Sequence, residues 1–142
     1  MAELATGHLK GVTNGAALVL GSGLGGGIII NGKLFQGSHF QAGELTFLLP
    51  LQMEKLDPSL MQETTLSAIG LITKVNEILA SLDLKDGLLA FKAINAKKEA
   101  VYPIFETYCR NLAITILNLQ TIFDMETFVL GGGISAQSIL IE

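Results

Sequence analysis

The strongest constraint on the fold is a dense cluster of glycines beside two apolar runs. Six glycines occur in LGSGLGGGIIING, residues 20–32, which follows the apolar run GAALV and contains three consecutive isoleucines. Glycine destabilises a regular strand or helix by roughly 0.5–1 kcal/mol relative to alanine. The cluster is therefore expected where the backbone turns tightly or where a ligand approaches it closely.

The end of this cluster predicts a β-hairpin. Asn31-Gly32 lies between GIII and KLF, and both residues of this pair tolerate the positive φ of a two-residue hairpin turn. We therefore expect a hairpin over residues 26–35. The preceding GAALVLG, residues 15–21, predicts a short apolar strand, and residues 41–49 (QAGELTFLL) predict another extended segment.

The middle of the chain has a helical period. Asp57-Pro58 predicts a helix start, and apolar residues then recur every three or four positions from Leu66 to Leu82. Two further helices are predicted over residues 87–95 and 96–123, and the second is expected to be buried because it is apolar on most sides. The opening AELATG predicts the last turns of another helix.

Near the end of the chain, TFVLGGGIS predicts a strand, a glycine turn and a final helix capped by Ser135. The order of three strands, three helices, a strand and a helix predicts an α/β fold.

Composition excludes several classes of protein. The 142 residues are 49% hydrophobic and 15% charged with a net charge of -4, which is unlike a disordered chain or a nucleic-acid-binding chain. The single Cys109 excludes an intrachain disulfide, and with His8 and His39 it lacks zinc-ligand spacing. No signal peptide or apolar run of about 20 residues occurs, so we expect a cytoplasmic chain without a membrane partner.

The glycine cluster invites two nucleotide motifs that its context excludes. GSGLGG matches G-x-G-x-x-G, but a strand follows where a dinucleotide-binding loop requires a helix, and no Walker A lysine is present. The alternatives are an ordinary tight turn and a turn whose N–H groups form an anion site, aided by the Ser22 hydroxyl. A second cluster, residues 131–133, also leaves a strand, so the two clusters are hypothesised to contact one nucleotide.

Three segments together resemble a known family. LGSGLGGGIIINGKLFQG, then AGE, then LNLQTIFDMETFVLGGGIS are similar to the C-terminal lobe of the ROK family of repressors, open reading frames and kinases. The resemblance implies a ribonuclease H-like lobe of the actin and hexokinase type. It also implies ATP- and Mg²⁺-dependent phosphorylation of a hexose, or the sugar-sensing lobe of a transcriptional repressor.

The resemblance also implies roles for individual residues. It assigns ATP phosphate binding to Gly21, Ser22, Gly23 and Gly25, and adenosine binding to Gly131, Gly132 and Gly133. It assigns sugar binding to Glu44, whose carboxylate would accept hydroxyl donors; the alternative for Glu44 is a solvated loop acid.

Two departures from the family pattern predict a zinc-free member. Phe47 occupies the position of a histidine that touches sugar and zinc in many relatives, and the following LLPLQMEKLD contains no cysteine. We therefore expect no metal site, and an apolar wall at Phe47 beside the sugar.

The N-terminal motifs of the family are absent from the chain. Neither an Asp-x-Gly-Gly-Thr loop nor the Asn-Asp segment with the general base occurs, so no catalytic residue is assigned. Residues 1–142 are expected to be a C-terminal lobe truncated at both ends and inactive alone. A dimerisation module, formed through the apolar residues 112–123, is a third possible function, and a homo-oligomer is expected.

Overall fold

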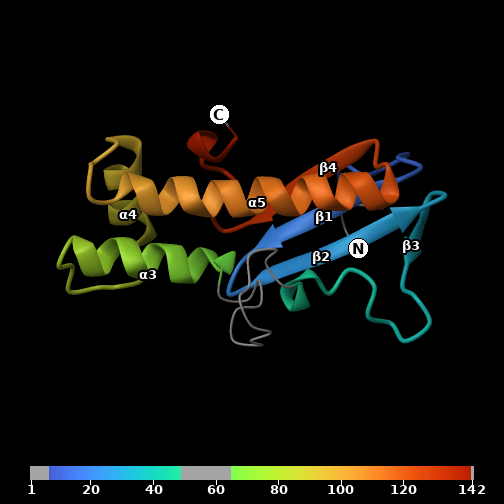
Figure 1. Cartoon of the computed structure of the whole chain (residues 1–142), viewed down its shortest axis with the longest axis horizontal. Helices are drawn as coiled ribbons and strands as arrows, with labels where there is room; N and C mark the ends of the chain where they lie inside the picture. The colour runs from blue at the N-terminus through green and yellow to red at the C-terminus, as the bar shows by residue number, and fades with distance from the viewer. Residues whose placement is uncertain (1–6, 49–64, 142) are drawn as a thin grey trace.

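The structure is a computed structural model that describes residues 7–48 and 65–141, and a mixed four-stranded sheet forms one end of it (Figure 1). Strands β1 (Gly15–Leu20), β2 (Leu24–Ile30) and β3 (Lys33–Phe35) form an antiparallel meander. Strand β4 (Thr127–Gly132) pairs in parallel with β1, so the sheet order is β3-β2-β1-β4.

One of the three helices covers a face of the sheet, and the other two lie beyond the end of the sheet (Figure 1). The three helices are α3 (Ala68–Ile78), α4 (Gly87–Asn95) and α5 (Tyr102–Phe123). Figure 1 shows α5 running lengthwise over the strands and on to α3 and α4, which lie past one end of the sheet. Two short 3-10 helices, η1 (Leu45–Phe47) and η3 (Ser138–Leu140), complete the described elements. This confirms a mixed α/β lobe in which strands precede helices and a further strand.

The predicted hairpin is confirmed at its turn. Asn31 and Gly32 have φ values of 54° and 72°, which are the two positive values of a type I′ turn. The strand on its first side is longer than expected, because pairing with β1 extends β2 back to Leu24.

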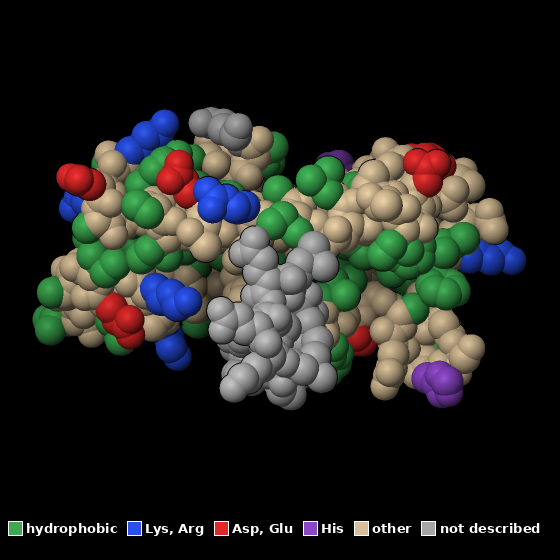
Figure 2. Space-filling model, viewed as in Figure 1, with side chains coloured by type: hydrophobic (Ala, Val, Ile, Leu, Met, Phe, Trp, Pro, Cys, Tyr) green, Lys and Arg blue, Asp and Glu red, His purple; other side chains and the backbone are tan. Residues whose placement is uncertain are grey.

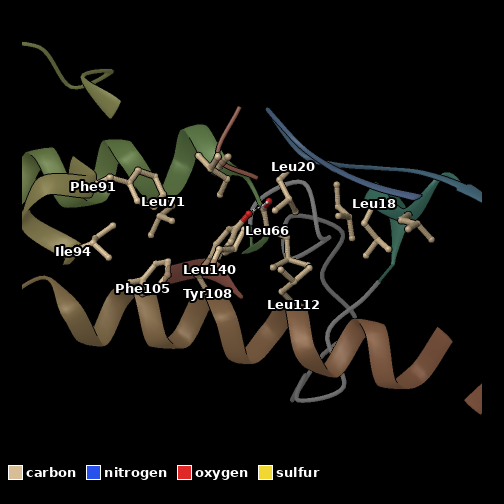
Figure 3. Packing of buried hydrophobic residues seen from close by; sticks show 14 of the residues in the cluster. Leu18, Leu20, Leu66, Leu71, Phe91, Ile94, Phe105, Tyr108, Leu112 and Leu140 are labelled. Carbon is tan, nitrogen blue, oxygen red and sulfur yellow. Dashed lines mark hydrogen bonds between the residues drawn. The ribbon is translucent and has the colours of Figure 1, made fainter. Parts of the chain in front are cut away.

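A continuous hydrophobic core joins the sheet to the helices (Figure 3). Alternate residues of β1 point inward, and Leu18 and Leu20 are completely buried towards α5. Further from the sheet, the rings of Phe91 and Phe105 meet edge to face with their centroids 6.3 Å apart. The Tyr108 hydroxyl donates to the carbonyl oxygen of Leu66 at 3.1 Å, which ties α5 to the start of α3.

The helix predicted from residue 57 through Leu82 ends earlier than predicted. In the part of the chain that the structure describes, α3 begins after Ser67, whose Oγ accepts from the Gly70 N–H at 2.9 Å. It ends at Ile78, and Ala80 has a φ of 51°, so Leu82 lies in a loop and is fully exposed. The predicted start at Asp57-Pro58 and the predicted N-terminal helix fall outside the described residues.

The helix predicted over residues 96–123 begins later, at Tyr102. Lys97 has a φ of 49°, which interrupts the helical conformation between α4 and α5. The expectation that this helix is buried on most sides is wrong, since Leu117 is 64% exposed and Ile122 is 69% exposed. Only one stripe of α5 faces the core.

Two other predictions of secondary structure are wrong. The segment over residues 41–48 is a pair of turns and the 3-10 helix η1 rather than extended chain. Ser135 does not cap a helix; its Oγ donates to the Gly132 carbonyl at 2.9 Å and closes a turn, and η3 is the element that follows it in the described residues. No helix of the described ranges is long and apolar enough to cross a lipid bilayer.

Candidate functional site

The two glycine clusters lie at the same edge of the sheet. Strands β1 and β4 are parallel and in register, with Leu20 opposite Gly132, so their carboxyl ends meet there. Residues 21–23 form the turn that follows β1, and residues 131–133 lie where β4 ends. The carboxyl ends of neighbouring parallel strands are the usual place for a ligand in α/β proteins.

A cavity of about 610 Å³ lies against this edge. Gly21 and Gly133 contribute one wall, and Ile69 and Ile72 of α3 with Leu88 of α4 contribute apolar walls. The remaining lining residues are Leu20, Ala68, Asp83, Lys85, Asp86, Gly87, Phe91, Ile134 and Gln137. The volume lies within the range of roughly 300–1,000 Å³ that is typical of small-molecule sites.

The glycines at this edge serve two different purposes. A Cβ built on Gly21 or on Gly133 would meet no heavy atom within 4 Å, so these residues leave space beside the backbone. Gly132 has a φ of 101°, and a Cβ there would strike the backbone of Leu20. Gly132 is therefore required by the backbone itself, whereas Gly21 and Gly133 leave the cavity open.

Hydrogen bonds connect the first glycine turn to α3. The Gly21 carbonyl accepts from the N–H groups of Ala68 at 2.8 Å and Ile69 at 3.4 Å, and the Gly21 N–H donates to the Gly23 carbonyl at 3.1 Å. The Gly21 N–H is thus used within the turn. The predicted anion site then depends on the N–H groups of Ser22 and Gly23 and on the exposed Ser22 side chain.

Gly25 lies outside this turn, and its assignment to ATP phosphate binding stays a prediction. It is a residue of β2, opposite Val19, and does not line the cavity. Its neighbour Gly26 has a structural role that the sequence did not reveal. A Cβ on Gly26 would lie 2.5 Å from the carbonyl oxygen of Gly43 and 2.6 Å from the Leu45 side chain. The loop before η1 therefore packs on β2 at a point where only glycine fits.

Glu44 and Phe47 lie on this loop, away from the cavity. Glu44 is exposed immediately before η1, and Phe47 is 62% exposed. Gly43 precedes them with a φ of 89° and approaches the backbone of Gly26 and Gly27, which holds the loop against β2. Neither Glu44 nor Phe47 lines the cavity. The structure therefore does not bring Glu44, the residue predicted to bind the sugar, together with the two glycine turns.

Asn76 supports the wall of the cavity and was missed by the sequence analysis. It is fully buried in α3, and its Nδ2 donates to the carbonyl oxygens of Leu84 at 3.3 Å and Asp86 at 2.9 Å. Asp86 in turn accepts from the Leu89 N–H at 2.9 Å and caps α4. A polar residue at a position that should face the core was the available signal.

The charged groups around the cavity are few. Lys85, Asp83 and Asp86 lie on the loop between α3 and α4. Within residues 7–48 and 65–141, no three His, Cys, Asp or Glu side chains gather into a cluster that could hold a metal ion. Burial raises the pKa of Tyr108 far above its ordinary value, and burial followed by the nearby Glu106 raises the pKa of Cys109. Both residues belong to α5 and neither lines the cavity.

Comparison with known proteins identifies relatives of this chain. The profile of the ROK family matches residues 1–142. The chain is 29% identical over 137 residues to the β-glucoside kinase of Klebsiella pneumoniae, an alignment that covers 94% of this chain and 46% of the kinase. The chain thus spans about half the length of the curated relatives it matches.

Solved structures show the same arrangement. The Lmo2764 protein from Listeria monocytogenes superposes with a TM-score of 0.85 at 26% identity, over 99% of this chain and 49% of that protein. A ROK family protein from Streptococcus pneumoniae, solved in complex with sucrose, gives a TM-score of 0.81 at 31% identity, over 98% of this chain and 46% of that one. With the profile matching its whole length and with this common lobe, the chain belongs to the ROK family, whose sugar kinases share the actin-like fold.

Proposed function

We propose that this chain supplies the nucleotide-binding half of an ATP-dependent kinase that phosphorylates a hexose in the cytoplasm. The observation that carries the proposal is the meeting of two glycine turns at one cavity, at the carboxyl ends of β1 and β4. Support also comes from the Klebsiella relative, which is a kinase of a sugar, and from the Streptococcus relative, which was solved with a sugar bound.

The lining of the cavity fits a nucleotide. Ile69, Ile72 and Leu88 offer apolar surface to a flat base, and the open space beside Gly21 and Gly133 admits a ligand close to the backbone. Lys85 is the cation of the lining and suits an anionic ligand. The residues therefore fit ATP better than they fit an uncharged sugar alone.

The residues of the two glycine turns and of the loop before η1 have separate binding roles in this proposal. Ser22 and Gly23 donate N–H groups, and Ser22 its hydroxyl, to phosphate oxygens, while residues 131–133 lie against the adenosine. Glu44 accepts hydrogen bonds from sugar hydroxyls, and Phe47 adds an apolar wall beside the sugar. Bound ATP with Mg²⁺ supplies the phosphoryl group.

The general base is not assigned to any residue of this chain. Phosphoryl transfer needs a group that orients and deprotonates the attacking hydroxyl. No acidic residue of this sequence has the family context for that role. We therefore expect the 142-residue chain to bind ATP without phosphorylating a hexose, and a coupled assay for ADP release should give no turnover above the buffer blank.

Nucleotide binding is the experiment that tests the proposal. Calorimetric titration of the chain with Mg·ATP should give saturable binding, and Gly21→Val or Gly133→Val should weaken it at least about tenfold, a loss of about 1.4 kcal/mol. Both substitutions place methyl groups in the open space of the cavity without a backbone clash. The matched control is Gly27→Val in β2, where a Cβ also meets nothing within 4 Å but the residue does not line the cavity.

The outcome separates the alternatives. If all three variants and the wild-type chain bind Mg·ATP equally well, the nucleotide does not bind in this cavity. Binding of a hexose with no binding of ATP would support the sugar-sensing lobe of a repressor instead.

A further inference from the structure

We propose that the side-chain amide of Gln137 binds the base of the nucleotide through a pair of hydrogen bonds that match the edge of a purine. The proposal rests on the nucleotide site proposed above and assigns the recognition of the base within it to one residue. Gln137 lies four positions after Gly133, and both residues line the cavity together with apolar residues of α3 and α4.

The backbone of Gln137 is anchored at the wall of the cavity. Its N–H donates to the Ile134 carbonyl at 3.1 Å, and its carbonyl accepts from the Leu140 N–H at 3.0 Å. The turn before it is closed by the bond from the Ser135 hydroxyl to the Gly132 carbonyl. Local hydrogen bonds therefore fix the point from which the Gln137 side chain extends.

The side-chain amide of Gln137 is not used within the fold. Gln137 precedes η3 without capping it, and its amide forms no hydrogen bond with residues 7–48 or 65–141. The two carboxylates that line the cavity do have partners, since Asp86 accepts from the Leu89 N–H and Asp83 accepts from the Lys85 N–H, both at 2.9 Å. The half-buried amide of Gln137 thus keeps its carbonyl oxygen and its NH₂ group available for a ligand.

The edge of a purine is the part of a nucleotide that matches this amide. Adenine carries its 6-amino donor beside a ring nitrogen that accepts, and guanine carries its 6-oxo acceptor beside the N1–H donor. The carbonyl oxygen and the NH₂ group of an amide lie in one plane, so they pair with adenine in one orientation and with guanine after a rotation of about 180°. A phosphate oxygen would engage the NH₂ group alone.

The surroundings of Gln137 favour a base over a phosphate group. A Cβ on Gly87, at the start of α4, would lie 3.5 Å from Cδ1 of Ile72, so α3 and α4 approach each other closely beside the cavity. Ile72 and Leu88 line the cavity there and offer apolar surface to the faces of a ring. Figure 2 shows Lys and Arg side chains interspersed with Asp and Glu over the helical half of the molecule, so charge alone does not single out a position for the ligand on that face.

Gln137→Glu distinguishes contact with the base from other contacts. A carboxylate only accepts hydrogen bonds, so on adenine it keeps the bond from the 6-amino group but faces the lone pair of the neighbouring ring nitrogen. On guanine it accepts from both the N1–H and the 2-amino group. We expect the ratio of the dissociation constant for Mg·ATP to that for Mg·GTP to rise at least about tenfold over the ratio of the wild-type chain.

Calorimetric titration of the full chain with Mg·ATP and with Mg·GTP measures this ratio. Gln137→Leu has a similar size and removes both hydrogen bonds, so it should weaken both nucleotides by about five- to a hundredfold. Gln36→Glu is the matched control, because Gln36 is exposed and does not line the cavity, and it should leave the ratio unchanged. Far-UV circular dichroism checks that each variant is folded, which we expect because the Gln137 amide has no partner in the described residues.

Each outcome separates this proposal from the nucleotide site on which it rests. A wild-type ratio in Gln137→Glu would place the amide against the ribose or the phosphates, which ATP and GTP share, and would overturn the proposal. Unchanged binding by Gln137→Leu, with weaker binding by Gly21→Val, would overturn the role of Gln137 and leave the nucleotide site in place. A wild-type chain that binds neither nucleotide would overturn both.

Discussion

Glycine has opposite roles at the two ends of the sheet. At the hairpin end, Asn31 N–H donates to the Asn14 side chain at 3.0 Å, Gly32 N–H donates to the Thr13 carbonyl at 2.8 Å, and Asn14 N–H donates to Glu126 at 3.1 Å. At the other end, residues 21–23 and 131–133 border a cavity of about 610 Å³.

The difference shows what a glycine cluster means in this fold. Gly32 is present because the turn needs positive φ, and the backbone around it is satisfied by internal hydrogen bonds. Gly21 and Gly133 need neither positive φ nor close packing, so what they contribute is empty space beside the backbone. We therefore call the hairpin end the closed end and the cavity end the open end. Substitutions at one end should leave the function of the other end unchanged.

The largest effect is expected at the open end, for Gly132→Ala. The φ of 101° is strained for alanine, and its Cβ would strike the Leu20 backbone. We expect the free energy of unfolding to fall by about 3–5 kcal/mol, measured by urea denaturation. Gly133→Ala is the matched control and should change it by no more than about 0.5 kcal/mol. A stable Gly132→Ala protein would show that the end of β4 tolerates a side chain.

The next largest effect on the free energy of unfolding is expected for Asn76→Ala. It removes both hydrogen bonds that hold the wall of the cavity and leaves the carbonyls of Leu84 and Asp86 without this donor. Loss of about 2–3 kcal/mol in the free energy of unfolding is expected. The exposed Asn118 of α5 offers a control, since Asn118→Ala should be nearly neutral. Similar losses for both variants would mean that burial of Asn76 has no special role.

How much of this could be predicted depends on the range of the interactions. The hairpin at Asn31-Gly32 was predictable because two adjacent residues determine its φ values. The meeting of the two glycine turns was a hypothesis from the sequence, and the parallel register of β1 and β4 brings them together. The Gly26–Gly43 contact and the Asn76 bonds were not predictable, since each joins segments that nothing in the local pattern connects.

The errors have the same origin. The apolar period continues to Leu82, but the helix ends at Ile78, and the positive φ of Ala80 turns the chain away from the helical path. The position of the loop that carries Glu44 was not predictable either, because the close approach of Gly26 and Gly43 holds it, and the sugar-binding role of Glu44 stays a prediction. Local spacing specifies turns and helix faces, whereas close approach between distant segments requires the packed structure.

Tyr108 links the open end to pH. Its hydroxyl donates to Leu66, directly before the start of α3, and burial raises its pKa well above 10.0, the value in an unfolded chain. Above about pH 10 the unfolded chain loses this proton while the folded chain keeps it, so stability falls by up to about 1.4 kcal/mol per pH unit. Tyr108→Phe should lack this contribution, which urea denaturation at pH 9.5 to 11 measures, roughly spanning the titration. Tyr102→Phe, as the control, should retain the wild-type slope.

Asn14→Ala tests the closed end and should have the smallest effect. It removes the acceptor of the Asn31 N–H but keeps the backbone bonds of Asn14, so we expect a loss of about 1 kcal/mol in the free energy of unfolding. Thr13→Ala keeps the carbonyl that Gly32 uses and should be neutral. Nucleotide binding should be unchanged in both variants, and a loss of binding in either would contradict the separation of the two ends.

A nitrogen-15 NMR titration with a non-hydrolysable Mg·ATP analogue would show directly which end of the sheet binds the nucleotide. We expect the amide signals of Ser22, Gly23 and the start of α4 to shift, together with those of Gly131, Gly132 and Gly133, while those of Asn31 and Gly32 stay unchanged. Shifts confined to the closed end, or no shifts at saturating nucleotide, would contradict the claim that the open glycine turns form the nucleotide site.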